Sequence, residues 1–351
     1  MSLTFQRILV IQTAFIGDVI LTLPLVQVLK RNFPDAAIDV VATPQASELF
    51  ANHPAIGRVI SFDKRGLDKG IRGFLRMKKE VSAGGYQLAV IPHRSLRSAL
   101  LAYSAGIPRR IGFDKSAGKW FLTQTVNYRS DIHEIERDLS LLKAVGIKSA
   151  VRELPTLNPR DKDRERIDRL LHDAHIDLKK PLVAIAPGTI WNTKRWPKER
   201  FAEVGRRLCE LGHIVVLVGS ESDRALCEEI ARLAKSDKII NTAGSLSLLE
   251  SAELIRRSGV IATNDSAPMH MAVAVRTPVV AVFGATVPSF GFSPYGEADT
   301  VVETLGLACR PCSIHGGRSC PIKTFDCMIN IESDRVFSLL QSKLDRSPRG
   351  H

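Results

Sequence analysis

Residues 182–201 bring together, in one short stretch, residue types that suit the binding of an anion. An apolar run, Leu182–Ala186, is typical of a buried parallel strand, and Gly188 and Thr189 follow it in a turn whose backbone amides can point outward. Lys194 adds a full positive charge just before Pro197, which suits the first turn of a helix that we expect to reach residue 211. Helix starts attract anions through free amides and the helix dipole. The stretch therefore predicts a phosphate site, although an ordinary solvated loop could have the same composition.

A second turn of this kind follows the apolar run that ends at Thr263. Asp265 can accept hydrogen bonds from sugar hydroxyls, and the amides of Ser266 and Ala267 at the next helix start could hold a phosphate. His270 lies one helical turn beyond Ser266 on the same face, although a histidine alone could equally be a packing residue. The turn predicts a second part of the same anion site.

Asp18 is the candidate catalytic residue of the first half of the chain. A strand is expected at residues 7–12, and Gly17 and Asp18 precede a helical apolar pattern, so Asp18 is placed at a helix start. The dipole stabilises an acid there, and a plain N-cap would use the same residue type. The Asp18 loop and the 188–194 loop each follow the first strand of a unit, so we expect them to meet across a cleft.

Strands and helices alternate along the whole chain, which predicts parallel sheets covered on both faces. Strands are expected at residues 7–12, 37–42, 58–62, 88–92, 109–112, 182–186, 213–218, 238–241, 260–263 and 278–283. A helix is expected at 131–145, and two prolines in 154–159 interrupt the pattern. We therefore expect two doubly wound, Rossmann-like domains, residues 1–156 and 157–351, with a last helix at 332–344 that could pack back on the first domain.

Composition predicts a soluble, two-domain protein. The chain has 351 residues, 44% of them hydrophobic, with no apolar run of the roughly 18 residues needed to cross a bilayer. The N-terminus lacks the pattern of a signal peptide, and six cysteines make no disulfide framework in a chain of this length. We expect a cytoplasmic protein, monomeric and without a cofactor.

The net charge of +12 is concentrated in one part of the chain. Residues 58–129 hold 15 Lys or Arg and 4 acids, so the first domain should carry a basic face. Such a face suits phosphorylated lipid, a membrane surface or nucleic acid, or it could simply aid solubility. The stretch lacks the interleaved aromatics of nucleic-acid binders, and no G-x-G-x-x-G follows a strand, which argues against a nicotinamide dehydrogenase.

The sequence offers two candidate metal-binding patterns, and neither is persuasive. Asp161 and Asp163 form an Asp-x-Asp at the start of a charged helix, where they should face solvent. Four cysteines are spaced C-x2-C-x7-C-x6-C, which contains one zinc-like pair and one pair too widely split for a zinc ribbon: Cys309, Cys312, Cys320 and Cys327. We predict reduced thiols and no metal.

Four ordered motifs resemble one known family. The runs TAFIGDVILTLP, PGTIWNTKRWP, TNDSAPMHMA followed by TPVVAVFG, and CRPCSIHGGRSCPIKTFDCM are similar to those of the ADP-heptose lipopolysaccharide heptosyltransferases, glycosyltransferase family 9. The match covers nearly the whole chain, and the KRWP form resembles heptosyltransferase II more than I. The resemblance implies a GT-B fold, with the donor in the second domain and the acceptor in the first.

The resemblance also implies roles for individual residues. Asp18 matches the catalytic base, and Lys194 matches the residue that holds the donor phosphates. The other implied donor-binding residues are Gly188 and Thr189, Asp223 at the ribose, Leu246 at the adenine, Asp265 at the sugar, Ser266 and Ala267 at the pyrophosphate, and His270 nearby. Two positions depart from the family pattern, because Ala267 replaces a glycine and Asp223 replaces a longer glutamate.

Inverting sugar transfer accounts for these residue types. A carboxylate takes the proton of the attacking hydroxyl, while a lysine and helix starts stabilise the departing diphosphate, so a metal is not required. The resemblance implies ADP-heptose as donor and an anionic lipopolysaccharide inner-core acceptor at the cytoplasmic face of the inner membrane. Arg94, Arg97 and Lys115 are weaker candidates for acceptor binding. A transferase or epimerase acting on another nucleotide sugar is the alternative.

Overall fold

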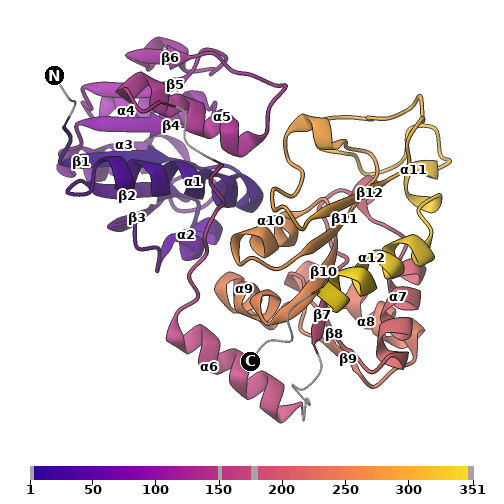
Figure 1. Ribbon diagram of the computed structural model, residues 1–351. Coiled ribbons are helices and arrows are strands. Elements are labelled where there is room, and N and C mark those ends of the chain that lie inside the picture. The colour runs from indigo at the N-terminus through magenta and orange to yellow at the C-terminus, as the bar shows by residue number, and fades with distance from the viewer. Residues whose placement is uncertain (1–3, 149–151, 175–180, 347–351) are drawn as a thin grey trace. The chain divides into compact units, whose positions relative to one another are not determined.

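The computed structural model describes residues 4–148, 152–174 and 181–346 (Figure 1). The chain divides into unit 1, Met1–Asn158, and unit 2, Pro159–His351. The sequence places the boundary at 156/157, within the proline-containing stretch 154–159. Of the helices in the described part of the chain, none combines the length and the apolar character needed to span a bilayer.

Unit 1 is built on one parallel six-stranded sheet in the order β3-β2-β1-β4-β5-β6. Its strands are β1 (Arg7–Ile11), β2 (Ala37–Ala42), β3 (Arg58–Ser61), β4 (Leu88–Ile91), β5 (Arg109–Phe113) and β6 (Gln124–Val126). The helices are α1 (Ile16–Asn32), α2 (Pro44–Phe50), α3 (Gly70–Ala83), α4 (Leu96–Ser104) and α5 (Glu134–Ser140), with 3-10 turns η1 (Lys119–Phe121) and η2 (Leu141–Val145).

Helices cover both faces of the unit 1 sheet, as Figure 1 shows. Leu9 and Ile11 of β1 belong to a buried cluster with Met77 of α3 and Leu101 of α4. The intervening strand residues point to the other face, where α1 lies and contacts α5. Most of α1, from Val19 to Leu29, is buried, so its apolar residues run around the helix rather than along one stripe.

Unit 2 has a second parallel six-stranded sheet, in the order β12-β11-β10-β7-β8-β9. Its strands are β7 (Leu182–Ala186), β8 (Ile214–Leu217), β9 (Ile239–Asn241), β10 (Ser258–Asn264), β11 (Val279–Phe283) and β12 (Thr300–Glu303). Its helices are α6 (Asp161–Asp173), α7 (Lys198–Glu210), α8 (Arg224–Ala234), α9 (Leu248–Arg256), α10 (Ala267–Ala274), α11 (Asp326–Ile329) and α12 (Ser333–Arg346), with 3-10 turns η3 (Asn192–Lys194), η4 (Glu221–Asp223) and η5 (Pro288–Phe290). When its strands are numbered from its own first strand, β7, this sheet has the same strand order as the unit 1 sheet.

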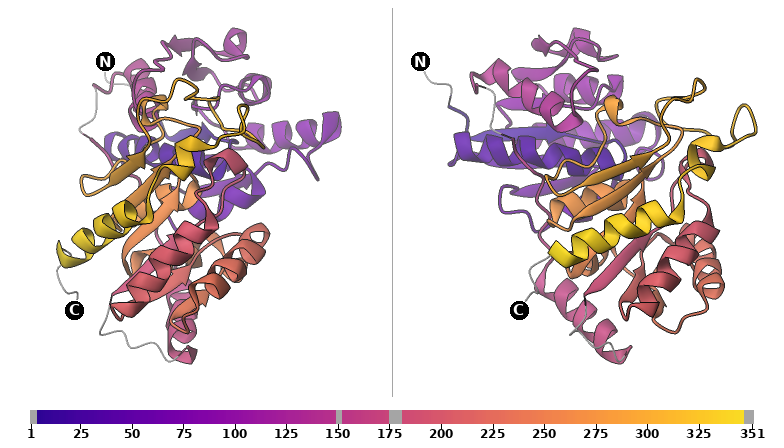
Figure 2. Two further views of the ribbon diagram at one scale, coloured as in Figure 1. Left: turned by 90° about the vertical axis from the view of Figure 1, so that its right-hand side faces the viewer. Right: turned by 45° about the vertical axis from the view of Figure 1, so that its right-hand side comes forward.

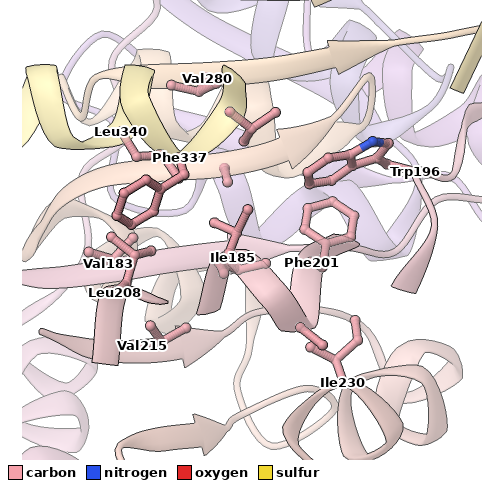
Figure 3. Packing of buried hydrophobic residues seen from close by; sticks show 14 of the residues in the cluster. Val183, Ile185, Trp196, Phe201, Leu208, Val215, Ile230, Val280, Phe337 and Leu340 are labelled. Carbon is pink, nitrogen blue, oxygen red and sulfur yellow. The ribbon is translucent and has the colours of Figure 1, made fainter. Parts of the chain in front are cut away.

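The main core of unit 2 lies between its sheet and the helices α7, α8 and α12. Figure 3 shows Ile185 of β7 packed near Phe201 of α7, with Trp196 above and Phe337 and Leu340 of α12 beside it. The Trp196 and Phe201 rings meet edge to face, with centroids 4.9 Å apart. The last helix, α12, packs on α7 and β10, and it lies along the unit 2 sheet in both views of Figure 2.

The expected doubly wound α/β class is confirmed in both units, and four local expectations were wrong. Asp163, expected to face solvent, is buried and accepts from the Arg160 guanidinium, whereas Asp161 is exposed as expected. Two edge strands, β6 and β12, were not expected, because both are short and partly exposed and lack an apolar run. The helix expected at 131–145 starts at Glu134 and continues after Ser140 as the 3-10 turn η2. Pro197 is the N-cap of α7 with extended backbone, ψ 134°, rather than a residue of its first turn.

Candidate functional site

The unit 2 site begins at its topological switch point, where β7 and β10 lie side by side and their connections leave in opposite directions. Asn264, the buried last residue of β10, donates from Nδ2 to the carbonyl of Pro187 at 2.8 Å. Its Oδ1 accepts from the Trp196 amide at 3.0 Å. One side chain therefore ties down both ends of the loop that follows β7.

A buried ion pair lies at this edge. Lys194 Nζ is 2.6 Å from Asp265 Oδ2, and the two side chains are only 14% and 9% exposed. The same carboxylate oxygen accepts from Thr286 Oγ1 at 2.7 Å. These residues come from the loops after β7, β10 and β11, so three neighbouring strands deliver one charged cluster. The sequence predicted that Lys194 and Asp265 share a site, and the structure brings them together.

Arg310 fixes the loop that carries Thr286. Its guanidinium donates to the carbonyl of Thr286 at 2.7 Å, to that of Thr304 at 2.9 Å and also to that of Gly284. It forms an ion pair with Glu303 at 2.7 Å and is almost fully buried. Arg310 therefore crosslinks the chain after β11 to the end of β12, a role the sequence analysis missed because nothing local marks it.

The cysteine-containing segment packs against the Lys194 loop. Thr193 accepts from the Gly317 amide through Oγ1 at 2.7 Å, and its own amide donates to the Gly317 carbonyl at 3.1 Å. Gly316 has φ +87°, and a Cβ there would come within 3.0 Å of the Lys194 side chain. Glycine therefore allows this segment to cover the Lys194 stem. Among the described residues, no group of three or more His, Cys, Asp or Glu side chains is arranged to hold a metal ion.

Gly188 and Asp223 meet where the loops after β7 and β8 lie side by side. A Cβ at Gly188 would fall 2.3 Å from Asp223 Oδ1, so only glycine permits this approach. Asp223 also accepts from the Ser220 amide at 2.9 Å and from its hydroxyl at 2.6 Å. Leu246, half-buried, precedes α9 in the loop after β9. These predicted donor residues thus follow neighbouring strands at one edge of the sheet.

The remaining unit 2 candidates lie on the same loops. Thr189 accepts at its carbonyl from Arg195 at 2.7 and 3.0 Å, which braces the turn before Lys194. Ser266 is the N-cap of α10 without a side-chain cap hydrogen bond, and Ala267 is its first residue. The first amides of a helix have no intrahelical acceptor, so they can bind an anion. His270, one turn later, is buried.

In unit 1, Asp18 is the third residue of α1 rather than its N-cap. The N-cap is Phe15, whose amide donates to Asp18 Oδ2 at 3.2 Å. The carboxylate therefore lies in the first helical turn, at the positive end of the helix dipole.

The unit 1 switch point, between β1 and β4, holds residues that the sequence analysis did not single out. Lys64 donates to the carbonyl and the hydroxyl of Thr13 at 3.0 and 2.8 Å, and Thr13 Oγ1 lies 3.0 Å from His93 Nδ1. Burial, and then the charges of Lys64 and Arg94, lower the pKa of His93 to about 4. Burial likewise lowers the pKa of Lys64. The rule that ligands bind beyond strand ends could have found them, since all three follow a strand.

The three weaker acceptor candidates fall into two places. The Arg94 guanidinium lies 4.1 Å from the centre of the Tyr128 ring, and Lys115 Nζ lies 5.8 Å from it, so these two cations lie near one aromatic ring. Arg97 points elsewhere, donating to the carbonyl of Asp68 at 2.7 Å at the start of α3. Only Arg94 and Lys115 are therefore brought together.

A family model described as glycosyltransferase family 9 (heptosyltransferase) matches residues 74–321. The chain belongs to this family. Lipopolysaccharide heptosyltransferase 2 of Salmonella typhimurium is 30% identical over 81% of this chain and 84% of its own length. Lipopolysaccharide heptosyltransferase 3 of Escherichia coli K12 is 30% identical over 77% and 80%. The enzyme class expected from the four motifs, a glycosyltransferase, is therefore confirmed.

The solved structure of a family 9 glycosyl transferase from Veillonella parvula has the same fold. It superimposes with a TM-score of 0.90 at 24% identity and covers 99% of each chain. Together with the two parallel sheets, this confirms the expected GT-B class of two doubly wound domains. The site roles implied by the motifs remain predictions.

Proposed function

We propose that this family 9 chain transfers L-glycero-D-manno-heptose from ADP-heptose to the lipopolysaccharide inner core, with inversion and without a metal ion. The observation that carries the donor half is the buried pair of Lys194 and Asp265 at the unit 2 switch point. This pair places an ammonium group and a hydrogen-bonding carboxylate together beyond the strand ends, where an anionic sugar donor could bind. The curated relatives named above are heptosyltransferases, which supports heptose as the sugar.

The donor would lie along the carboxyl edge of the unit 2 sheet. Lys194 and the first amides of α10 would hold the diphosphate, and Asp265 would then accept from a sugar hydroxyl. Asp223, beside Gly188, would bind the ribose and Leu246 the adenine. Because the leaving group gains negative charge as the glycosidic bond breaks, a fixed ammonium stabilises the transition state more than the ground state.

Asp18 would act as the general base of unit 1. An acceptor hydroxyl attacks the anomeric carbon, its proton passes to the Asp18 carboxylate, and the bond to the diphosphate breaks on the opposite face. One new glycosidic bond forms, ADP leaves, and the configuration is inverted. The basic group of Arg94 and Lys115 would hold carboxylates or phosphates of the acceptor. This step requires that Asp18 and the unit 2 donor site close on one sugar.

The deciding experiment is a product assay with ADP-heptose and truncated inner-core acceptors offered side by side. The proposal expects one acceptor to gain the mass of one heptose, with release of ADP and an inverted linkage by NMR. An epimerase would add no mass to any acceptor. A different nucleotide sugar used in preference would support the alternative transferase. The acceptor that reacts would also show which heptose of the inner core this chain adds. Sequence identity leaves this open, because a heptosyltransferase 2 and a heptosyltransferase 3 are both 30% identical to the chain.

We further propose that this chain acts as a monomer bound peripherally to the inner membrane through unit 1. Exposed apolar side chains lie just before α3, on α3, at the start of α4 and on η1, namely Leu67, Ile71, Leu75, Leu96 and Trp120, and we call this group the apolar ridge. Ile71 and Leu75 are four residues apart on the outer face of α3, whose buried face is Gly73, Met77 and Val81. A shallow cavity of about 490 Å³ beside the ridge is lined by Ile71, Phe74, Leu96 and Leu100.

Exposed cations border this ridge, namely Arg65, Lys69, Arg72 and Lys79. The nearby acids are already engaged, since Asp68 is buried against Arg76 and Glu80 pairs with Arg58. An apolar ridge with cations along it fits the interface of a bilayer that contains anionic lipid. The same surface would bring unit 1 to a membrane-linked acceptor.

Vesicle binding tests this membrane proposal. The double variant Ile71→Ser/Leu75→Ser should bind phosphatidylglycerol-containing vesicles more than tenfold more weakly, because each side chain contributes about 1.5 kcal/mol or more when buried. Leu305→Ser, an equally exposed residue of unit 2, is the matched control and should bind like the parent. Equal loss in both variants, or equal parent binding to phosphatidylcholine vesicles, would contradict the proposal. The molar mass from light scattering in solution tests whether the chain is a monomer.

A further inference from the structure

Asp138, on α5, is a fully buried carboxyl group that the proposed mechanism does not use. It is 0% exposed, and it packs behind α1, the helix that carries Asp18. Its Oδ2 lies 2.8 Å from Thr22 Oγ1, while its Oδ1 is buried without a hydrogen-bond partner. An ionised carboxylate in this position would lack the donors that normally stabilise a buried charge.

The hydroxyl of Thr22 shows which protonation state fits. Thr22 Oγ1 has three polar neighbours: Gln12 Nε2 at 2.8 Å, the Asp18 carbonyl at 2.9 Å and Asp138 Oδ2 at 2.8 Å. The amide nitrogen can only donate and the carbonyl can only accept, and a hydroxyl has one hydrogen. All three contacts are satisfied together only if Thr22 donates to the Asp18 carbonyl and Asp138 carries a proton that it donates to Thr22.

The charges around Asp138 agree with this reading. Burial, and then the charge of Asp18, raise the pKa of Asp138 to about 8, against the Thr22 hydrogen bond and Arg137. The Arg137 guanidinium is directed to other groups, since it donates to the carbonyls of Arg129 and Ile132 and pairs with Glu134. On η2, which also packs against α5, Lys143 is exposed.

We propose that Asp138 is a positioning residue that stays protonated at neutral pH and, through Thr22, holds the first turn of α1 and its Asp18 carboxylate in place. The inference rests on the proposed role of Asp18 as base. When Asp138 loses its proton, the Thr22 hydrogen must turn from the Asp18 carbonyl to the new carboxylate. A second negative charge then lies behind Asp18 in a poorly solvated place. Both changes disturb the base, so transfer should fall on the alkaline side.

The first test compares pH profiles of kcat/KM for heptose transfer. The parent should show an alkaline limb with an apparent pKa near 8, and Asp138→Asn, which is neutral at every pH, should lose that limb while its acid limb stays in place. Asp131→Asn, an exposed acid near α5, is the control and should keep both limbs. A purely structural role would lower the rate at every pH instead. An unchanged alkaline limb in Asp138→Asn would overturn the proposal.

The Thr22 bridge gives a second kinetic test. Thr22→Val removes the hydroxyl at nearly constant volume and should lower kcat at neutral pH at least tenfold, with the KM for ADP-heptose moving less than threefold. Thr22→Ser restores a hydroxyl and should recover most of the rate. A serine variant no better than valine would argue against the bridge.

A measurement without substrate separates this inference from the proposed function. In parent protein labelled with ¹³C at the aspartate carboxyls, one resonance should titrate near pH 8 and be missing from Asp138→Asn. If no aspartate titrates above about pH 6, the inference fails even when transfer is observed. If the resonance titrates as expected but no acceptor gains heptose, the proposed function fails and the protonated Asp138 stands.

Discussion

The two units share one strand order but hold different chemistry at their switch points. In unit 2, the loops beyond β7 and β10 are joined by an ion pair between Lys194 and Asp265. In unit 1, the corresponding loops beyond β1 and β4 meet through Thr13 and an uncharged His93. The same backbone plan therefore offers a lysine paired with a carboxylate in unit 2, and a lysine bonded to Thr13 beside an uncharged histidine in unit 1. This difference suits diphosphate binding by unit 2 and proton removal in unit 1.

Asp18→Asn should separate the two units most clearly. It keeps the shape of the side chain but removes the base, so we expect turnover to fall on the order of 10³–10⁴-fold. ADP binding, which we propose for unit 2, should remain within about threefold by calorimetry. Parental turnover in the variant would show that Asp18 is not the base. Loss of ADP binding in the variant would contradict the proposal that unit 2 binds the donor without Asp18.

Lys194→Ala should act on the donor side. Loss of the fixed ammonium should reduce kcat/KM for ADP-heptose about 10²–10³-fold. It also leaves Asp265 as a buried carboxylate that still accepts from the Thr286 hydroxyl but has lost its ion-pair partner, so the melting temperature should be measured in parallel. Lys198→Ala, a nearby lysine paired with Glu229, is the control and should change the rate less than threefold. Equal effects of both lysines would mean that general charge, rather than this pair, matters.

Gly188→Ala tests the close approach to Asp223. The added Cβ would lie 2.3 Å from the carboxyl group, so the loop or Asp223 must move. We expect a tenfold or larger rise in the KM for ADP-heptose, with kcat less affected. Gly306→Ala, with open space around it but a positive φ of +76°, controls for the general effect of adding a methyl group. Unchanged donor KM in Gly188→Ala would show that Asp223 does not bind the donor in this position.

Acid should destabilise unit 1 through its buried histidines. Burial lowers the pKa of His53, and burial with nearby cations lowers that of His93, each to about 4. The unfolded chain binds these protons at about pH 6.5, so stability is lost as the pH falls from about 6.5 to 4, by about 3 kcal/mol per group. Urea unfolding of His93→Asn against pH should show a shallower slope than the parent. An equal slope would mean that His93 is not held neutral.

Metal removal should have the smallest effect. If Lys194 and the α10 helix start supply the charge that a metal would provide, EDTA should leave the transfer rate unchanged. Metal analysis of protein purified without chelator checks the four cysteines of residues 309–327 separately. One zinc per chain would contradict the prediction of reduced thiols. Inhibition by EDTA would show that transfer needs a metal ion in addition to the residues of the two units.

Much of the fold could be predicted because parallel strands buried on both faces leave long apolar runs such as Leu182–Ala186 and Val279–Phe283. Edge strands leave no such run, so β6 and β12 were missed. The Lys194 and Asp265 loops were found since each combines glycine or small residues, a charge and a helix start. The role of Arg310 was not found, because its guanidinium donates to carbonyl groups of residues up to 27 positions away.

The order of elements, the class of fold and the family follow from local patterns in the chain, because periodicity and short motifs are properties of neighbouring residues. Which charged side chains pair with one another depends on contacts between residues far apart in sequence, and only folding creates these contacts. Asp138 shows the difference: in the sequence it is one acid in the charged run EIERDL, and only its burial beside Thr22, 116 positions away, makes it a candidate for a protonated carboxyl.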